Sequence, residues 1–176
     1  DEDIKLYLNK IGQKYGTVRT LLSPYQQTPV QSIYVCNDIV RNIPVPGRFR
    51  NTYTVEYIHN ASAQDLAACS NFIIIIGTGG IGKSMMIRHL LLDAIERYPE
   101  DGIVPVFLML KDYDVSSSSL LEYLVSKIHN FSPGITADHL ASLLDAGRCL
   151  LLLDGLDEVG TKQADAFEKK LEEFID

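Results

Sequence analysis

The chain has 176 residues, a formal net charge of −7 and 46% hydrophobic residues. This length suits one domain, or one domain with an extension, and the composition excludes a disordered protein. The acidic balance argues against a broad nucleic-acid-binding surface, and the longest apolar runs are shorter than the about 20 residues that a membrane helix needs. Three widely spaced cysteines form no C-x-x-C pair, so neither a disulfide framework nor a zinc site is expected and a reducing cytoplasm fits best.

The first residues follow an amphipathic pattern that predicts a helix. Apolar side chains recur there at steps of three and four, and Asp1 or Asp3 is available as the cap. The apolar positions are Ile4, Leu8, Ile11, Tyr15, Val18 and Leu22. Two prolines in SPYQQTP break the pattern, so residues 1–30 are interpreted as an N-terminal helix and linker. The helix either packs against the domain or connects it to another domain upstream.

The next segment, residues 31–61, is predicted to be rich in strands. SIYVCNDIV and TYTVEYI are rich in β-branched and aromatic residues, and PVPGR between them indicates a turn or loop. A short helix is expected to follow, from Ala63 to Cys69.

The remainder of the chain, residues 62–176, alternates between strand and helix patterns. FIIII, VPVFLML and CLLLLD are apolar runs of the kind expected for parallel strands buried on both faces. Helices are predicted from Lys83 to Tyr98 and over SSSSLLEYLVSKIHNF, TADHLASLLDAG and TKQADAFEKKLEEFID. This order predicts an α/β fold, with a parallel sheet covered by helices.

A glycine-rich segment between the first strand and its helix fits the pattern G-x-x-x-x-G-K-[ST]. Glycines let the backbone approach a ligand closely, and a helix that begins near Lys83 points its positive end at the same place. Lys83 can then reach the β- and γ-phosphates, and the Ser84 hydroxyl can bind Mg²⁺. The predicted nucleotide-binding residues are Gly77, Thr78, Gly79, Gly80, Ile81, Gly82, Lys83, Ser84 and Met85. FIIII is predicted to be the buried strand that holds this loop; the alternative is a strand-to-helix turn without a ligand.

A second pattern, LLLLDGLDE, ends the third predicted strand in an acid. Asp154 suits the Mg²⁺-holding position of phosphate-loop enzymes, and Gly155 leaves room beside it. Asp157 and Glu158 then supply carboxylates that can orient a water toward a γ-phosphate. We therefore predict Ser84 and Asp154 as metal ligands, and Asp157, Glu158 and Lys83 as catalytic residues. The alternative is a solvated acidic loop after a core strand.

Other polar residues give weaker signals. The four histidines have no metal-ligand spacing. Lys111, Asp112 and Asp114 follow the second strand on the side where ligands bind open sheets, but a plain polar loop is the better interpretation.

Together, GTGGIGKS and LLLLDGLDE resemble the NACHT group of signal-transducing ATPases with numerous domains, known as STAND proteins. The small residue after Asp154 and the two acids beyond it are that group's form of the second motif. VPVFLMLKDYD is similar to its second strand, and YLNKIGQKYGTVRTLL with SIYV to a segment that often precedes bacterial members. The resemblance implies a three-layer αβα sandwich of the P-loop NTPase fold, AAA+ and STAND-like, of which this chain holds the N-terminal part.

The resemblance also implies a function. Members bind ATP or ADP with Mg²⁺, switch between the two states, form homo-oligomers on activation, and carry effector and sensor domains in the same longer chain, commonly in immunity or antiphage defence. A slow regulatory ATPase is therefore the leading expectation. The alternatives are a nucleotide-binding oligomerisation module without significant turnover, and another AAA-type or transporter-type ATPase or a small-molecule kinase.

One expectation concerns strand order. Families with a water-activating acid beside the magnesium aspartate insert a further strand between the phosphate-loop strand and the magnesium strand. It would begin beyond Asp176, so FIIII and CLLLLD are predicted to lie about 9–10 Å apart rather than to pair directly. Residues 1–176 are then expected to be a cut-out of a longer domain that aggregates or stays partly molten when expressed alone.

Overall fold

A computed structural model describes residues 1–20, 23–36, 38–45, 53–114, 119–159 and 161–175. It begins with helix α1 (Glu2–Tyr15), whose N-cap is Asp1. The helix ends earlier than the predicted stripe, because Gly16 closes it and the β-branched residues that follow form strand β1 (Thr17–Thr20). Val18 therefore lies in a strand and not on the helix, while Leu22 lies outside the described residues. β1 pairs antiparallel with β2 (Ser23–Pro29), which was expected to be a linker.

The segment before the glycine loop is only partly as predicted. SIYVCNDIV is not one strand: helix α2 (Val30–Ile33) occupies its start, after Pro29 at the N-cap, and strand β3 (Ile39–Pro44) begins near its end. β4 (Tyr53–Ile58) confirms the second predicted strand and pairs antiparallel with β3. Most of PVPGR lies outside the described residues. Helix α3 (Ala63–Cys69) is confirmed, and its capping box with Ser62 lowers the pKa of Asp65.

The remaining elements follow the predicted alternation. Long helix α4 (Lys83–Asp101) leads to strand β5 (Val104–Met109) and the 3₁₀ turn η1 (Leu110–Asp112). Then come α5 (Leu120–His129), α6 (Ala137–Asp145), β6 (Cys149–Asp154), the 3₁₀ turn η2 (Leu156–Glu158) and α7 (Thr161–Ile175). β5 and β6 are parallel, from Val104 opposite Cys149 to Met109 opposite Asp154. Their carboxyl ends therefore meet at one edge, where ligands bind open α/β sheets.

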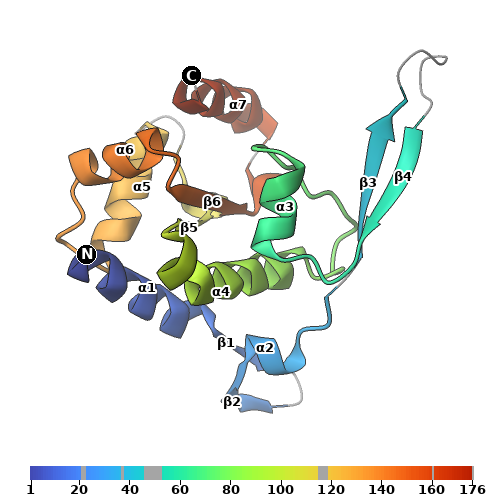
Figure 1. Ribbon diagram of the computed structural model, residues 1–176, viewed down its shortest axis with the longest axis horizontal. Helices are drawn as coiled ribbons and strands as arrows, with labels where there is room; N and C mark the ends of the chain where they lie inside the picture. The colour runs from blue at the N-terminus through green and yellow to red at the C-terminus, as the bar shows by residue number, and fades with distance from the viewer. Residues whose placement is uncertain (21–22, 37, 46–52, 115–118, 160, 176) are drawn as a thin grey trace.

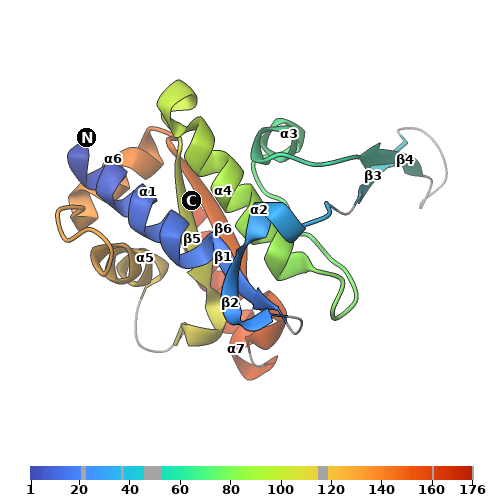
Figure 2. The same cartoon turned by 90° about the horizontal axis from the view of Figure 1, so that it is seen from below.

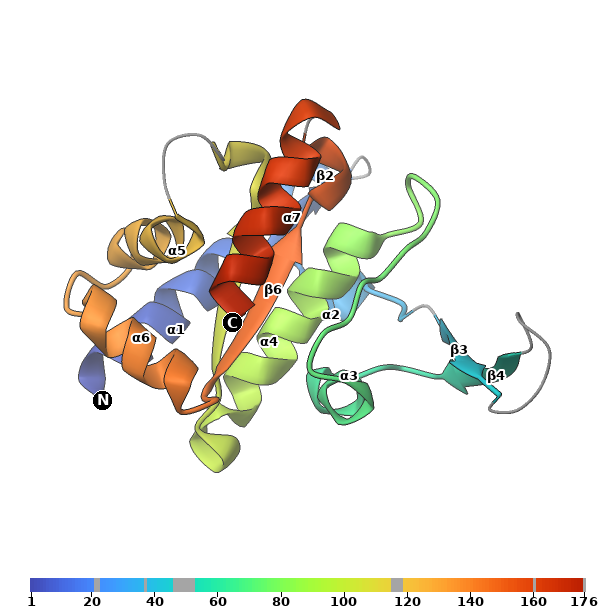
Figure 3. The same ribbon diagram turned by 90° about the horizontal axis from the view of Figure 1, so that it is seen from above.

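Helices lie on both sides of this strand pair. α1 and α4 are on one side of it and α7 is on the other (Figures 1 and 3). Seen from below, α1 and α4 lie in front of the strands, with the β1–β2 hairpin (Figure 2). The helices and the parallel pair agree with the α/β prediction, whereas the complete three-layer sandwich stays a prediction. Within the described ranges, no helix is both long enough and apolar enough to cross a membrane.

The prediction that FIIII is a buried strand is wrong for the described structure. Residues 72–76 belong to no strand, and Ile74 and Ile76 are 74% and 89% exposed. A strand requires a hydrogen-bonded neighbour, and β6 pairs only with β5 among the described residues. Residues 72–76 and β6 are not paired in the described structure, and the inserted strand and the spacing stay predictions.

The apolar face of α1 is part of the main core. Ile4, Tyr7, Leu8 and Ile11 are buried in the same cluster as residues of α4 and β5. The Tyr7 hydroxyl donates a 3.2 Å hydrogen bond to the carbonyl oxygen of Pro105 in β5, and burial raises the pKa of Tyr7. The N-terminal helix therefore packs directly on the strand pair.

We predict that Tyr7→Phe lowers the free energy of unfolding by about 1 kcal/mol at neutral pH, because the Pro105 carbonyl loses its buried donor. The wild type loses stability as pH rises above about 10, since Tyr7 ionises more easily in the unfolded chain. The phenylalanine side chain cannot ionise, so the variant does not lose stability in this way. The difference in free energy of unfolding between the two proteins should therefore become smaller above about pH 10. Urea unfolding of the full-length protein at several pH values measures both effects. Tyr25→Phe is the control, because Tyr25 is 99% exposed.

Candidate functional site

The glycine segment forms the predicted loop before α4. Gly80 and Gly82 have φ angles of +79° and +99°, values that residues other than glycine rarely adopt. A Cβ atom built on Gly79 or Gly80 would meet no atom within 4 Å, so the loop borders open space on that side. Gly77 is tighter, because its Cβ would lie 3.1 Å from Cγ2 of Ile81. On that side, no side chain therefore covers the backbone of Gly79 and Gly80.

Lys83 is the first residue of α4, and its side chain contacts the start of the loop. Its Nζ donates hydrogen bonds of 2.8 Å to the Gly77 carbonyl and 3.3 Å to the Thr78 carbonyl. These contacts hold a positive charge between the loop and the helix N-terminus. The first amides of α4 have no intrahelical acceptor, so the cation and the helix dipole act on the same place. Ile81 is half exposed over the loop, and Met85 is partly buried in the first turn.

The second motif meets the first at Ser84 and Asp154. The Ser84 hydroxyl donates a 3.1 Å hydrogen bond to Oδ1 of Asp154, although the two residues are 70 positions apart. Asp154 is the last residue of β6, and Gly155 follows with φ +82°, which turns the chain away. The two predicted metal ligands are therefore side by side.

The other predicted acids lie one turn further on. Asp157 and Glu158 belong to η2 and are exposed, and the amide of Glu158 donates to the Gly155 carbonyl at 3.0 Å. η2 packs against η1, which carries Lys111 and Asp112 from the end of β5. Both turns thus stand at the carboxyl edge of the strand pair, beside the Ser84–Asp154 contact.

The residues present fit a nucleotide phosphate with Mg²⁺. No side chain covers the backbone of Gly79 and Gly80, and Lys83 lies beside the same loop, so positive charge and open backbone are available for an anion. The hydroxyl of Ser84 and the carboxylate of Asp154 are hard oxygen donors, and Mg²⁺ typically takes one or two protein ligands together with water and phosphate oxygens. Among the described residues, no group of three or more histidine, cysteine or acidic side chains could hold a metal.

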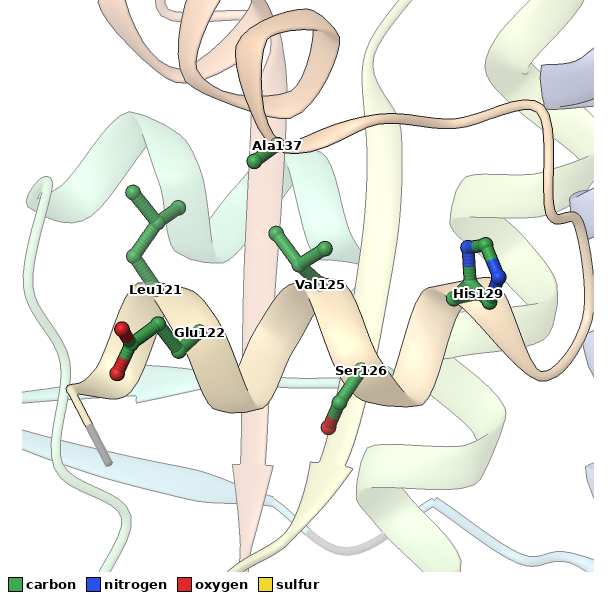
Figure 4. A pocket seen from close by; sticks show the side chains of 6 residues that line it. All are labelled: Leu121, Glu122, Val125, Ser126, His129 and Ala137. Atoms are coloured by element: carbon green, nitrogen blue, oxygen red, sulfur yellow. The ribbon is translucent and has the colours of Figure 1, made fainter. Parts of the chain in front are cut away.

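A separate apolar hollow of about 390 Å³ lies between α5 and α6. Figure 4 shows Leu121 and Val125 on one of its walls and Ala137 on the other. No residue of either motif lines it, and the predicted site depends on the two motifs alone.

Both ends of α3 are held by hydrogen bonds that the sequence does not predict. The Arg41 guanidinium on β3 donates a 3.1 Å hydrogen bond to the carbonyl of Cys69, and Asp93 on α4 accepts from the amide of Ala63 at 3.0 Å. These bonds fix the helix that leads into the glycine segment. No local pattern could have revealed them, because each joins residues at least 28 positions apart.

The chain was compared with known protein families, curated proteins and solved structures. The family model for the NACHT domain matches residues 71–175, which is more than half of the chain. The match begins at Asn71, just before FIIII and the glycine segment, and includes Asp154 and both 3₁₀ turns. Neither the search of curated proteins nor that of solved structures found a match.

We predict that Gly80→Ala weakens nucleotide binding at least about ten-fold, because alanine opposes the left-handed backbone that shapes the loop. Gly147→Ala is the matched control: its φ is also positive and its methyl group also enters open space, but it lies after α6, outside the loop. Titration with a fluorescent ATP analogue, together with thermal unfolding, separates binding from folding. Equal loss of affinity in both variants would show that the effect does not arise in the loop.

Proposed function

Because the chain belongs to the NACHT domain family, and so contains a nucleotide-binding P-loop NTPase module, we propose that it is an Mg²⁺-dependent ATP/ADP switch that regulates a longer protein. The observation that carries the proposal is the Ser84–Asp154 hydrogen bond at 3.1 Å, beside the loop that Lys83 closes. These are the elements that a phosphate–magnesium site needs, from two distant parts of the chain. ATP rather than GTP is supported by the resemblance to STAND ATPases.

The loop residues would bind and orient the phosphates. The bare backbone of Gly79 and Gly80 would accept phosphate oxygens, and Lys83 would place its charge against the terminal phosphates. Ser84 and Asp154 would hold Mg²⁺, which when bound neutralises the charge that develops during phosphoryl transfer. The direct bond between Ser84 and Asp154 would then open, because both oxygens would turn to the ion.

Asp157 or Glu158 would orient the attacking water and take its proton. Both are exposed in η2, three and four residues after Asp154, so water can reach their carboxylates. Within the described ranges, no hydrogen bond or ion pair joins either carboxylate to the glycine loop. Slow hydrolysis follows naturally, since a base that is not held against the nucleotide orients water poorly.

The switching role is supported by the family resemblance. ADP would mark the resting state and ATP an active homo-oligomer, with effector and sensor domains in the same chain serving signalling or antiphage defence. The rival proposal from another class is a binding and oligomerisation module in which nucleotide is structural and turnover is insignificant. The exposed position of Asp157 and Glu158 is consistent with both proposals, and the rate of hydrolysis distinguishes them.

We predict that Lys83→Ala lowers the affinity for both ATP and ADP by about 1.5–3 kcal/mol, because a charge-assisted contact is lost. Isothermal titration of the full-length protein measures it. Lys111→Ala is the control, since that lysine lies in η1 outside the loop. Unchanged affinity in Lys83→Ala would exclude the phosphate site, and competition with GTP and dATP in the wild type would test the base preference.

We also predict that the double variant Asp157→Asn, Glu158→Gln keeps nucleotide affinity and slows hydrolysis about 100-fold or more, as expected when a general base is removed. Single-turnover measurement with the full-length protein gives the rate and the affinity together. If the wild type binds tightly but consumes no ATP above buffer, the binding-module proposal stands instead. If binding falls while hydrolysis persists, the two carboxylates have been given the wrong roles.

A further inference from the structure

A two-stranded ribbon, formed by β3 and β4, projects from the rest of the chain (Figures 1 and 2). Its two faces differ. One face is anchored by Arg41, which pairs with Glu56 at 3.6 Å and donates to Cys69 at the end of α3. The other face carries Asn42 and Pro44 together with four large side chains that are about half exposed: Val40 53%, Tyr53 51%, Val55 49% and Tyr57 60%. A two-stranded ribbon is marginally stable alone, so this face and its edges favour a partner.

The outer edge of the ribbon belongs to β4. In Figure 1 the upper part of β4 lies beyond β3, on the side away from the rest of the chain. Among the described residues it pairs only with β3, so one row of its backbone donors and acceptors faces outward. Exposed edges are usually blocked by proline, lysine or a bulge. β4 has none of these, and its single charge, Glu56, is already paired across the ribbon.

We propose that β4 is an interface for a second copy of this chain, which pairs antiparallel with its own β4 across a two-fold axis at Val55. In this register Val55 faces Val55 of the copy, and Tyr53 faces Tyr57 on both sides of the axis. Directly opposite residues share a face, so three apolar pairs line the same side of the new sheet. The product is a four-stranded sheet, β3-β4-β4-β3, with the three apolar pairs at the centre of one face.

Apolar overlap and charge favour this register. The axis at Val55 pairs Tyr53, Val55 and Tyr57 with one another, whereas an axis one residue earlier would leave Tyr57 outside these pairs. With the axis one residue later, Glu56 would face Glu56, and like charges directly opposite are destabilising. Pairing through β3 is weaker, because Pro44 supplies no backbone N–H. The same patch thus fits itself, as a two-fold interface requires.

Sedimentation velocity of the full-length protein, over about a hundred-fold range of concentration with and without nucleotide, tests the interface. Val55→Lys places two cations face to face at the axis and should weaken dimerisation at least about ten-fold. Thr54→Lys is the matched control: it adds the same residue one position away, opposite Glu56 of the copy, and should retain or tighten the dimer. A protein that stays monomeric throughout, or a dimer that Val55→Lys leaves unchanged, would overturn the pairing and leave the ribbon to a different partner protein.

Disulfide trapping keeps the test valid if the lysine variants fold poorly. Val55→Cys should give a rapid dimer under mild oxidation, because the two Cβ atoms of a directly opposite pair are about 4.5–5.5 Å apart. Thr54→Cys should not, since its copy lies diagonally away. Wild-type protein, with Cys36, Cys69 and Cys149 unchanged, gives the background. Equal trapping at positions 54 and 55 would overturn the register.

Discussion

The hydrogen bond between Ser84 and Asp154 is the contact on which the site depends. It joins the first turn of α4 to the carboxyl end of β6, and therefore the glycine loop to the acidic turn after it. Neither motif alone makes a phosphate–magnesium site, since the loop supplies positive charge and backbone, and the strand supplies the carboxylate. The two motifs can form one site only because α4 and β6 hold the side chains of Ser84 and Asp154 at hydrogen-bond distance.

That distance is maintained by packing far from the loop. α4 buries Met86, Leu90 and Leu91 against the strand pair, and α1 covers the neighbouring surface with its own apolar face. Tyr15 at the end of α1 contacts Phe107 in β5, with ring centroids 4.6 Å apart, and the Arg88 guanidinium of α4 lies 5.8 Å from the Tyr15 ring. The helix before the family match is thus part of the support for the nucleotide loop. A change in α1 can alter the site without touching it.

Local patterns in the sequence predicted the elements whose composition or spacing is visible within one segment. Helices α3 and α5, the apolar runs of β5 and β6, and both site motifs are of this kind. The failures have a different origin. FIIII has the composition of a buried strand, but a strand is a property of two segments, and no described neighbour pairs with it. The stripe through Val18 has helical spacing, yet Gly16 and the β-branched residues after it favour a hairpin. Long-range bonds such as Arg41 to Cys69 leave no local signature.

Two exposed apolar segments remain, and they differ in what they can bind. Residues 72–76 lack the hydrogen-bonded ladder of a strand, so pairing with a partner would have to fix that backbone against its conformational entropy. β4 is already ordered by β3, with six paired positions and an alternating pattern that places its aromatic residues on one face. A preorganised edge loses less entropy on association. The ribbon is therefore the better preformed contact surface. Association through β4 would leave the glycine loop accessible, because the ribbon projects away from it (Figure 3).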